Sequence, residues 1–238
     1  MHGTDEEHAK RAVALHAIDT YVTTDGCIGL GSGSTMRYAI ERVGELVAGG
    51  ARIRAVATSH ETERLCRDAK IPLVAFGDEP IDIAIDGTDE IDPQWSLVKG
   101  GGGALFREKA VALSARTFVV IATDRKCVDR LGRFPLPVEV VPFSTAFVAR
   151  EIEALGANVI LRRSGYDGRA FVSDNGNAIL DCGFGAIASA QILDRILREI
   201  HGVVSTGLFI GLASAVFVSK PDGSVAALPP PAHGALTF

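Results

Sequence analysis

Three short segments of the chain concentrate glycines and charged side chains that could bind and transform a small anionic molecule. Residues 29–35 read GLGSGST, residues 86–92 read DGTDEID, and residues 99–109 read KGGGGALFREK. The backbone N–H groups of a glycine turn can surround an anion, while carboxylates and lysines can transfer protons and stabilise developing charge. Together these residue types predict proton transfer on a phosphorylated small molecule.

The first segment, 29–35, has the form of a turn between a strand and a helix, where the helix N-terminus favours negative charge. A tight structural turn without a ligand is an alternative that this segment alone leaves open. A nucleotide P-loop would need a lysine that is absent, and a dinucleotide fingerprint would need glycine in place of Ser34. A phosphate monoester therefore fits better. The binding residues predicted here are Ser32, Gly33, Ser34 and Thr35.

The second segment, 86–92, follows a predicted strand at 81–85, in which isoleucines alternate with other residues. A solvated calcium loop is an alternative, but the twelve-residue pattern with its terminal glutamate is missing. Ligands of doubly wound folds lie beyond the carboxyl ends of the strands, where these acids are expected. The binding residues predicted here are Asp86, Gly87, Thr88 and Asp89.

The third segment joins Lys99 to Glu108 through four consecutive glycines. Ordering four glycines has a high conformational-entropy cost, so a fold that keeps them needs an unusual backbone conformation or a close approach to a ligand there. A surface lysine and an exposed helical glutamate are the ordinary alternatives for the two charged residues. Their convergence with the other two segments at one edge of a sheet favours a functional role. The residues predicted here are Lys99, Gly100, Gly101, Gly102 and Glu108.

The elements that must position these segments alternate between strand and helix in the first half of the chain. After an N-terminal helix, apolar stretches predict strands and 3.6-residue spacing predicts helices. This alternation implies a mostly parallel sheet with helices on both faces. The strands are predicted at 27–30, 53–57, 73–76, 81–85 and 117–122, and the helices at 34–47, 61–68 and 104–115.

The second half of the chain predicts a smaller α+β unit with antiparallel pairing. An Asn-Gly turn at 174–177 lies between apolar segments, which is a strong hairpin signal. The later apolar segments, 203–210 and 215–218, are expected to return to the first sheet. We therefore predict one domain of residues 1–130, completed by about 203–238, and a second of residues 131–202. The strands of the smaller unit are predicted at 138–141, 159–163, 170–172 and 178–180, and its helices at 143–155 and 188–200.

Composition excludes several broad classes of protein. A chain of 238 residues with 22% charged residues is long enough to bury a core without disulfide or metal staples. The formal charge of −5 disfavours a nucleic-acid coat, and no apolar run reaches the roughly 18 residues that span a bilayer. The four cysteines and six histidines form no metal-binding spacing. We expect a cytoplasmic protein without a signal peptide, metal, nucleic-acid or membrane partner.

The ordered set GSGST, DGTDEI, KGGGGALFREK, GRFPLPVEV and DNGNAILD resembles the ribose-5-phosphate isomerase family, type A, over roughly residues 10–225. The resemblance implies a cofactor-free enzyme of the pentose phosphate pathway that interconverts ribose 5-phosphate and ribulose 5-phosphate. It also implies a Rossmann-like, mostly parallel sheet flanked by helices, a second smaller α+β domain, and a homodimer or homotetramer.

The resemblance also assigns roles to individual residues of this chain. Glu108 corresponds to the catalytic base of an isomerisation through an enediolate, and Lys99 with the glycine-loop N–H groups would stabilise the enediolate oxygens. The aspartates Asp86 and Asp89 would orient the sugar and assist ring opening. Residues 32–35 and Lys126 would hold the 5-phosphate, so that remote binding energy positions the reacting carbons.

Two other functions are weighed against this one. A glucosamine-6-phosphate isomerase/deaminase would also bind a sugar phosphate, but it should carry a histidine-containing acid–base set that the sequence does not show. A non-catalytic sugar-phosphate sensor should bring a DNA-binding segment, whereas we expect only one helix before the sheet begins. Conversion of ribose 5-phosphate, with glucosamine 6-phosphate tested alongside, separates the three functions.

Overall fold

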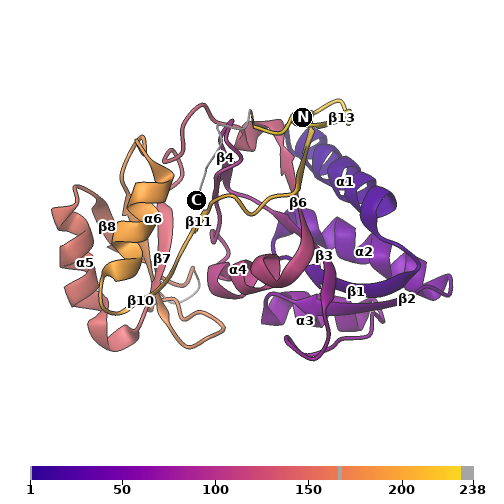
Figure 1. Cartoon of the computed structure of the whole chain (residues 1–238), viewed down its shortest axis with the longest axis horizontal. Coiled ribbons are helices and arrows are strands. Elements are labelled where there is room, and N and C mark those ends of the chain that lie inside the picture. The colour runs from indigo at the N-terminus through magenta and orange to yellow at the C-terminus, as the bar shows by residue number, and fades with distance from the viewer. Residues whose placement is uncertain (1, 166–167, 232–238) are drawn as a thin grey trace.

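The computed structural model describes residues 2–165 and 168–231 and is built around a six-stranded sheet in the order β13-β12-β6-β3-β1-β2 (Figure 1). All neighbouring strands are parallel except β13, which pairs antiparallel with β12. The predicted mostly parallel sheet is therefore confirmed. Its strands are β1 (Asp25–Leu30), β2 (Arg52–Ala57), β3 (Ile81–Gly87), β6 (Ala115–Thr123), β12 (Ala215–Ser219) and β13 (Val225–Ala227).

Helices cover both faces of this sheet because its central strands are apolar on both sides. In β3, Ile83 and Ile85 pack into the core beneath three helices, while Ala84 between them packs on the opposite side. The buried residues of the fourth helix, Val111 and Ala112, lie in that opposite core. The first face carries α1 (His2–Tyr21), α2 (Ser34–Ala48) and α3 (His60–Asp68), and the other carries α4 (Leu105–Ser114).

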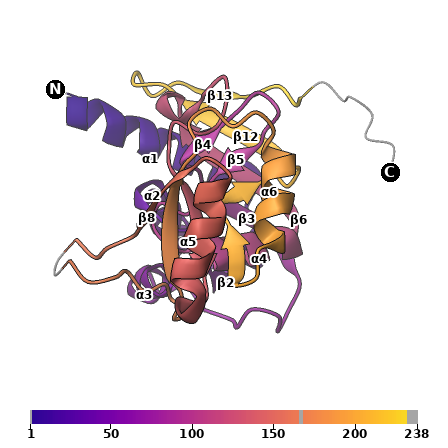
Figure 2. The same ribbon diagram turned by 90° about the vertical axis from the view of Figure 1, so that its left-hand side faces the viewer.

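A second, four-stranded antiparallel sheet in the order β10-β7-β9-β8 lies beside the first (Figures 1 and 2). Two helices bury Val148, Ile152 and Leu197 against it. A three-stranded ribbon in the order β11-β5-β4 is the third sheet. The second sheet contains β7 (Leu136–Val140), β8 (Asn158–Leu161), β9 (Ala178–Gly183) and β10 (Val203–Thr206), with α5 (Thr145–Ala154) and α6 (Ala190–Glu199); the ribbon contains β4 (Glu90–Ile91), β5 (Leu97–Val98) and β11 (Leu208–Phe209).

One predicted strand, 203–210, is wrong as a single element and does not return to the first sheet. It breaks at Gly207 into β10, which joins the four-stranded sheet, and β11, which joins the ribbon. The backbone passes so close to its neighbours there that a Cβ on Gly207 would lie 2.4 Å from the carbonyl oxygen of Lys99. The chain therefore changes direction between two different pairing partners. Only the next strand, β12, returns to the first sheet as predicted.

Two further segments predicted as strands, 73–76 and 170–172, form only isolated β-bridges. Segment 73–76 pairs with β2 only through Leu73, because the chain turns away toward Gly77 and leaves Phe76 exposed. Around the Asn-Gly turn, Gly176 N–H donates to the Ser173 carbonyl at 2.8 Å, as a tight turn requires. Its predicted first strand, 170–172, makes only single bridges on either side.

The topology places one edge of the large sheet at the functional segments. Strand β1 is followed by β2 on one side of the sheet, whereas β3 is followed by β6 on the other, so the order reverses between the neighbours β1 and β3. Open α/β sheets bind ligands at the carboxyl ends of strands at such a reversal. The glycine turn after β1 and the acidic segment at the end of β3 meet there.

Candidate active site

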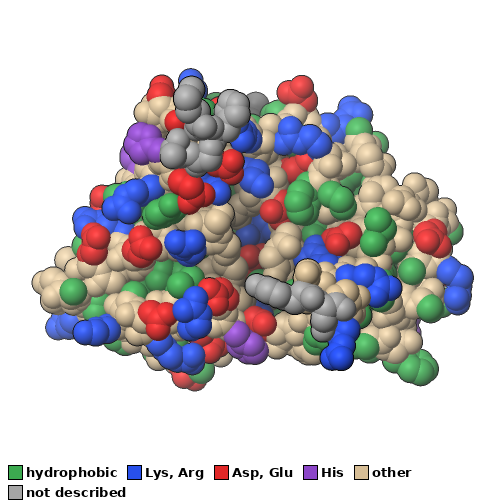
Figure 3. Space-filling model, turned by 180° about the vertical axis from the view of Figure 1, so that it is seen from behind, with side chains coloured by type: hydrophobic (Ala, Val, Ile, Leu, Met, Phe, Trp, Pro, Cys, Tyr) green, Lys and Arg blue, Asp and Glu red, His purple; other side chains and the backbone are tan. Residues whose placement is uncertain are grey.

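A cavity opens at this reversal and is bordered by all three segments singled out in the sequence. Of the residues predicted to bind a ligand, only Asp86 is missing from its lining. On the face of the molecule that Figure 3 shows, basic and acidic side chains are interspersed, so neither sign of charge dominates that face. The cavity is lined by Glu6, Lys10, Ser32, Gly33, Ser34, Thr35, Gly87, Thr88, Asp89, Lys99, Gly100, Gly101, Gly102, Glu108, Ile121, Ala122, Thr123 and Lys126.

The deep end of the cavity is a buried cation between two carboxyl groups. Lys99 Nζ lies 2.9 Å from Asp86 Oδ2 and 3.4 Å from Glu108 Oε2, and it donates to the Gly87 carbonyl at 2.7 Å. All three ionisable side chains are buried. Burial lowers the pKa of Lys99, but the carboxylates of Asp86 and Glu108 more than offset this, so its pKa is raised and the ammonium stays charged.

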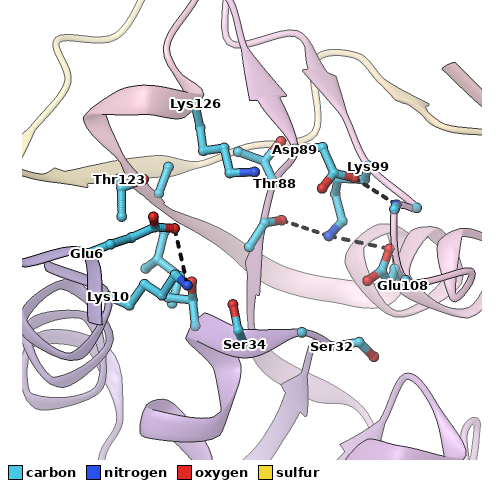
Figure 4. A pocket seen from close by; sticks show the side chains of 18 residues that line it. Glu6, Lys10, Ser32, Ser34, Thr88, Asp89, Lys99, Glu108, Thr123 and Lys126 are labelled. Carbon is cyan, nitrogen blue, oxygen red and sulfur yellow. Dashed lines mark hydrogen bonds and ion pairs between the residues drawn. The ribbon is translucent and has the colours of Figure 1, made fainter. Parts of the chain in front are cut away.

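The carboxyl group of Glu108 is set up to exchange a proton near neutral pH. It lies in the first turn of α4, and its side chain points toward Lys99 (Figure 4). Burial and the nearby Asp86 carboxylate raise the pKa of Glu108 to about 8, against the opposing effect of Lys99. No group among the described residues donates a hydrogen bond to its Oε2 atom. A carboxyl with such a pKa can both take up and return a proton.

Asp86 lies beneath the cavity wall rather than in it. Its Oδ1 accepts hydrogen bonds from the N–H groups of Gly87 at 2.7 Å and Ser32 at 3.2 Å. A Cβ on Gly31 would lie 1.9 Å from the same oxygen, so the turn after β1 needs glycine at this position. Burial raises the pKa of Asp86, opposed first by Lys99. Asp86 therefore acts on the cavity through Lys99 and the glycine turn.

Asp89, by contrast, faces the cavity. Its Oδ2 accepts a hydrogen bond from the Gly101 N–H at 2.8 Å, which joins the acidic segment to the four-glycine segment. The cavity therefore carries a second carboxylate within the reach of a bound molecule, close to Glu108 and Lys99 (Figure 4).

The opposite end of the cavity has the chemistry of an anion-binding site. Helix α2 begins there with Gly33 at φ +105° and with no side chain capping its first turn. The N–H groups of Gly33, Ser34 and Thr35 have no acceptor within residues 2–165 and 168–231. Because free N–H groups and the helix dipole attract negative charge, this end suits a phosphate. Lys126 approaches the same space from the short 3₁₀ helix Asp124–Lys126 (Figure 4).

The hydroxyl of Ser32 faces away from this anion site. Its Oγ lies 2.8 Å from Ser59 Oγ, 2.9 Å from Thr58 Oγ1 and 3.2 Å from Thr62 Oγ1. The Ser32 side chain thus ties the glycine turn to the start of α3. Of the four residues predicted for phosphate binding in this turn, Gly33, Ser34 and Thr35 present free donors to the cavity.

Two charged lining residues, Glu6 and Lys10, were not predicted from the sequence. Glu6 and Lys10 project from α1 into the cavity, and Lys10 Nζ lies 3.2 Å from Glu6 Oε1 (Figure 4). Their four-residue spacing is a common helical ion pair and carries no sign of a ligand. Only the packing of α1 on the face of the large sheet brings them to the cavity, with Glu6 Oε2 lying 3.2 Å from Arg125 Nη1, just after β6.

The described part of the chain contains no group of three or more His, Cys, Asp or Glu side chains arranged to hold a metal ion. Within the same residues, no helix is both long enough and apolar enough to cross a membrane. The cysteines are free thiols; Cys27, Cys66 and Cys182 are buried, and Cys127 is exposed.

Comparison with known proteins gives a consistent result. The family model described as ribose 5-phosphate isomerase A (phosphoriboisomerase A) matches residues 54–223. Ribose-5-phosphate isomerase A of Roseiflexus sp. (strain RS-1) is 46% identical over 225 residues, covering 93% of this chain and 96% of the relative. That of Gluconobacter oxydans (strain 621H) is also 46% identical, covering 94% and 97%.

Solved structures agree in fold over nearly the whole chain. Ribose 5-phosphate isomerase A from Methanocaldococcus jannaschii superposes with a TM-score of 0.88 at 34% identity, covering 92% of this chain and 97% of that one. A D-ribose-5-phosphate isomerase in complex with phospho-erythronic acid superposes with a TM-score of 0.89 at 34% identity, covering 93% and 98%. The resemblance inferred from the motifs is confirmed, and the chain belongs to the ribose 5-phosphate isomerase A family.

Proposed function

We propose that the chain interconverts D-ribose 5-phosphate and D-ribulose 5-phosphate through an enediolate, with Glu108 as the base. The observation that carries this proposal is the buried Glu108 carboxyl, with its pKa raised to about 8, beside the Lys99 ammonium. The reaction removes a proton from C2 of the aldose and returns it to C1, or the reverse. One carboxylate can take the proton and give it back, so no redox partner is consumed.

The remaining groups divide between the two ends of the substrate. Lys99 and the N–H groups of the four-glycine segment would stabilise the enediolate oxygens, and Asp89 would orient a sugar hydroxyl. At the other end, the N-terminus of α2 and Lys126 would hold the 5-phosphate, with Lys10 as a further cation. The phospho-erythronic acid bound to a 34% identical relative supports a phosphorylated sugar chain as the ligand class.

Replacement of Glu108 by glutamine tests the proposal directly. Loss of the base should lower the rate of ketose formation from ribose 5-phosphate by about 10²–10⁴-fold, while binding of the sugar phosphate persists. Glu153→Gln, an exposed position on α5, is the matched control and should keep the wild-type rate. Near-normal turnover by Glu108→Gln would remove Glu108 from this role, and turnover of glucosamine 6-phosphate in place of ribose 5-phosphate would redirect the substrate assignment.

The cytoplasmic location remains a prediction from composition, and the homodimer or homotetramer remains a prediction from the family resemblance. Light scattering coupled to size-exclusion chromatography measures the oligomeric state. The proposed steps use only side chains and backbone groups of this chain, and we expect activity to survive a chelator. Loss of activity with a chelator and recovery with a divalent metal would contradict this mechanism.

A further inference from the structure

An arginine from the four-stranded sheet holds the four-glycine segment of the cavity. Arg162 directly follows β8, and its Nη1 donates to the carbonyl oxygens of Gly100 at 2.9 Å and Gly101 at 3.0 Å. Its Nε and Nη2 donate to the two carboxylate oxygens of Asp181, at 2.9 and 2.5 Å. The side chains of Arg162 and Asp181 are 12% and 24% exposed. This bidentate pairing fixes the plane of the guanidinium against the glycine backbone.

The two carbonyl groups that Arg162 binds belong to the same peptide units as the N–H groups of Gly101 and Gly102, two residues that line the cavity. The Gly100 carbonyl shares its peptide with the Gly101 N–H, which donates to Asp89 Oδ2 at 2.8 Å. The Gly101 carbonyl shares its peptide with the N–H of Gly102, a residue that lines the cavity. In the described residues, this second N–H has no acceptor. Because a cation at a carbonyl oxygen polarises the whole peptide, both N–H groups become stronger donors.

The glycine segment needs such an external support. Gly100 adopts φ +99°, and a Cβ on Gly101 would lie 2.9 Å from Asp89 Oδ1, so larger residues are disfavoured at both positions. Glycines have the greatest backbone freedom, and a loop made of them does not hold its own conformation. The Phe171 ring packs against Gly103, where a Cβ would lie 2.5 Å away, and Arg162 lies 5.8 Å from the centre of the same ring.

We propose that Arg162, oriented by Asp181, is a positioning residue that fixes and polarises the 100–102 backbone as the donor wall for the reacting end of the substrate. Arg162 does not line the cavity, so it acts through the glycine peptides and not on the substrate. The inference rests on the proposed isomerase function. It predicts that the guanidinium matters most when negative charge develops on the substrate oxygens.

Kinetics of Arg162→Met, Arg162→Lys and Asp181→Asn test this inference. Loss of a direct donor of this kind lowers kcat about 10²–10³-fold, so loss of its support should lower kcat by about tenfold or more, with KM changed by less than about threefold. Lysine keeps the charge but cannot reproduce the bidentate geometry, so Arg162→Lys should lie between Arg162→Met and wild type. The matched control is Arg64→Met, which removes an arginine that makes an equally bidentate contact with Glu61 on the outside of α3.

Inhibition by phospho-erythronic acid gives a readout that a purely structural role would not move. A sugar acid places negative oxygens where the enediolate would form, so its inhibition constant should rise in proportion to the fall in kcat/KM across the folded variants. Far-UV circular dichroism shows which variants are folded. If Arg162→Met does not fold, the kinetics of Asp181→Asn and Arg162→Lys test the positioning role of Arg162.

The outcomes separate this inference from the proposed function. Wild-type kcat and inhibition in the folded Arg162 and Asp181 variants, with an active wild-type protein, overturn the inference alone. A rise in KM with unchanged kcat overturns it too, because it would show uniform binding. A wild-type protein that does not convert ribose 5-phosphate refutes the proposed function, and the inference fails with it.

Discussion

The Asp86→Asn variant tests whether the buried Asp86 carboxylate sets the pKa of the base. Asp86 Oδ2 and Glu108 Oε2 contact the same Lys99 Nζ atom at 2.9 and 3.4 Å, so the two oxygens are at most about 6 Å apart. Two unit charges at that distance interact by about 3 kcal/mol at an effective dielectric constant of 20, which corresponds to about two pH units. Removing the Asp86 charge should therefore lower the pKa of Glu108 from about 8 by about two pH units.

The sign of the effect follows from the state in which the base works. Glu108 accepts a proton only as the carboxylate, so kcat/KM of the wild-type protein should rise with pH through about 8. In Asp86→Asn, this rise should move toward acid by about two pH units, while burial keeps the pKa of Glu108 above its ordinary value. The plateau at high pH should be lower, because a neutral amide holds the Lys99 ammonium less strongly than the carboxylate does.

The assay is the pH dependence of kcat/KM for ribose 5-phosphate, measured in wild-type protein and in two aspartate variants. Asp82→Asn is the matched control, because it makes the same change on the same strand, β3, at the end far from the cavity, and its profile should match the wild type. If kcat/KM of Asp86→Asn rises at the same pH as in the wild type, Asp86 does not raise the pKa of Glu108 and the reasoning is refuted. That result would show that burial and the Asp89 carboxylate raise the pKa of Glu108 without help from Asp86.

Three further changes have expected outcomes. Gly31→Ala should lower kcat/KM about 10²-fold in the isomerase assay, because the new Cβ would lie 1.9 Å from Asp86 Oδ1 and must displace it. Glu139→Met should lower the free energy of unfolding in urea by at least about 2 kcal/mol, because the buried Glu139 Oε1 accepts three side-chain hydrogen bonds that would be left unmade. Burial lowers the pKa of Lys109 from 10.5 to about 8. Between pH 8 and pH 10.5 the unfolded chain therefore binds more protons than the folded protein. The free energy of unfolding of the wild-type protein should rise by about 3 kcal/mol as the pH increases over this range. Urea unfolding at both pH values should show this gain in wild type and not in Lys109→Met; an equal gain in the variant would contradict the assignment.

The sequence correctly predicted those strands in which the pattern of apolar residues matches the way the strand packs in the sheet. Residues 81–85 alternate as a strand does, and as β3 they lie in the middle of the large sheet with a core on each face. The functional segments were located because they directly follow such strands. Residues 203–210 read VVSTGLFI, and the single glycine did not by itself specify a break. The break at Gly207 depends on its close contacts with Lys99 and Pro137, which are distant in sequence.

The predicted site residues converge because their motifs lie at strand ends, but their individual placement required the packing. Nothing local distinguishes Asp86, beneath the wall, from Asp89, which faces the cavity. Lys10 and Arg162 could not be recognised, since neither belongs to a motif that indicates a ligand. Arg162 and Gly101 are 61 residues apart in sequence, and they meet only because the end of β8 lies against the segment that follows β5.

The charges at the deep end of the cavity suit a proton that moves between substrate and base. With Glu108 ionised, its carboxylate shares the Lys99 ammonium with Asp86, and burial together with this excess of negative charge raises the pKa of Glu108. In the proposed reaction, the proton from the substrate carbon neutralises Glu108 while the negative charge passes to the enediolate oxygens. The net charge of the buried region does not change in that step, and the Lys99 ammonium is already in place. A site that need not reorganise its dipoles as the charge moves is one that lowers the barrier.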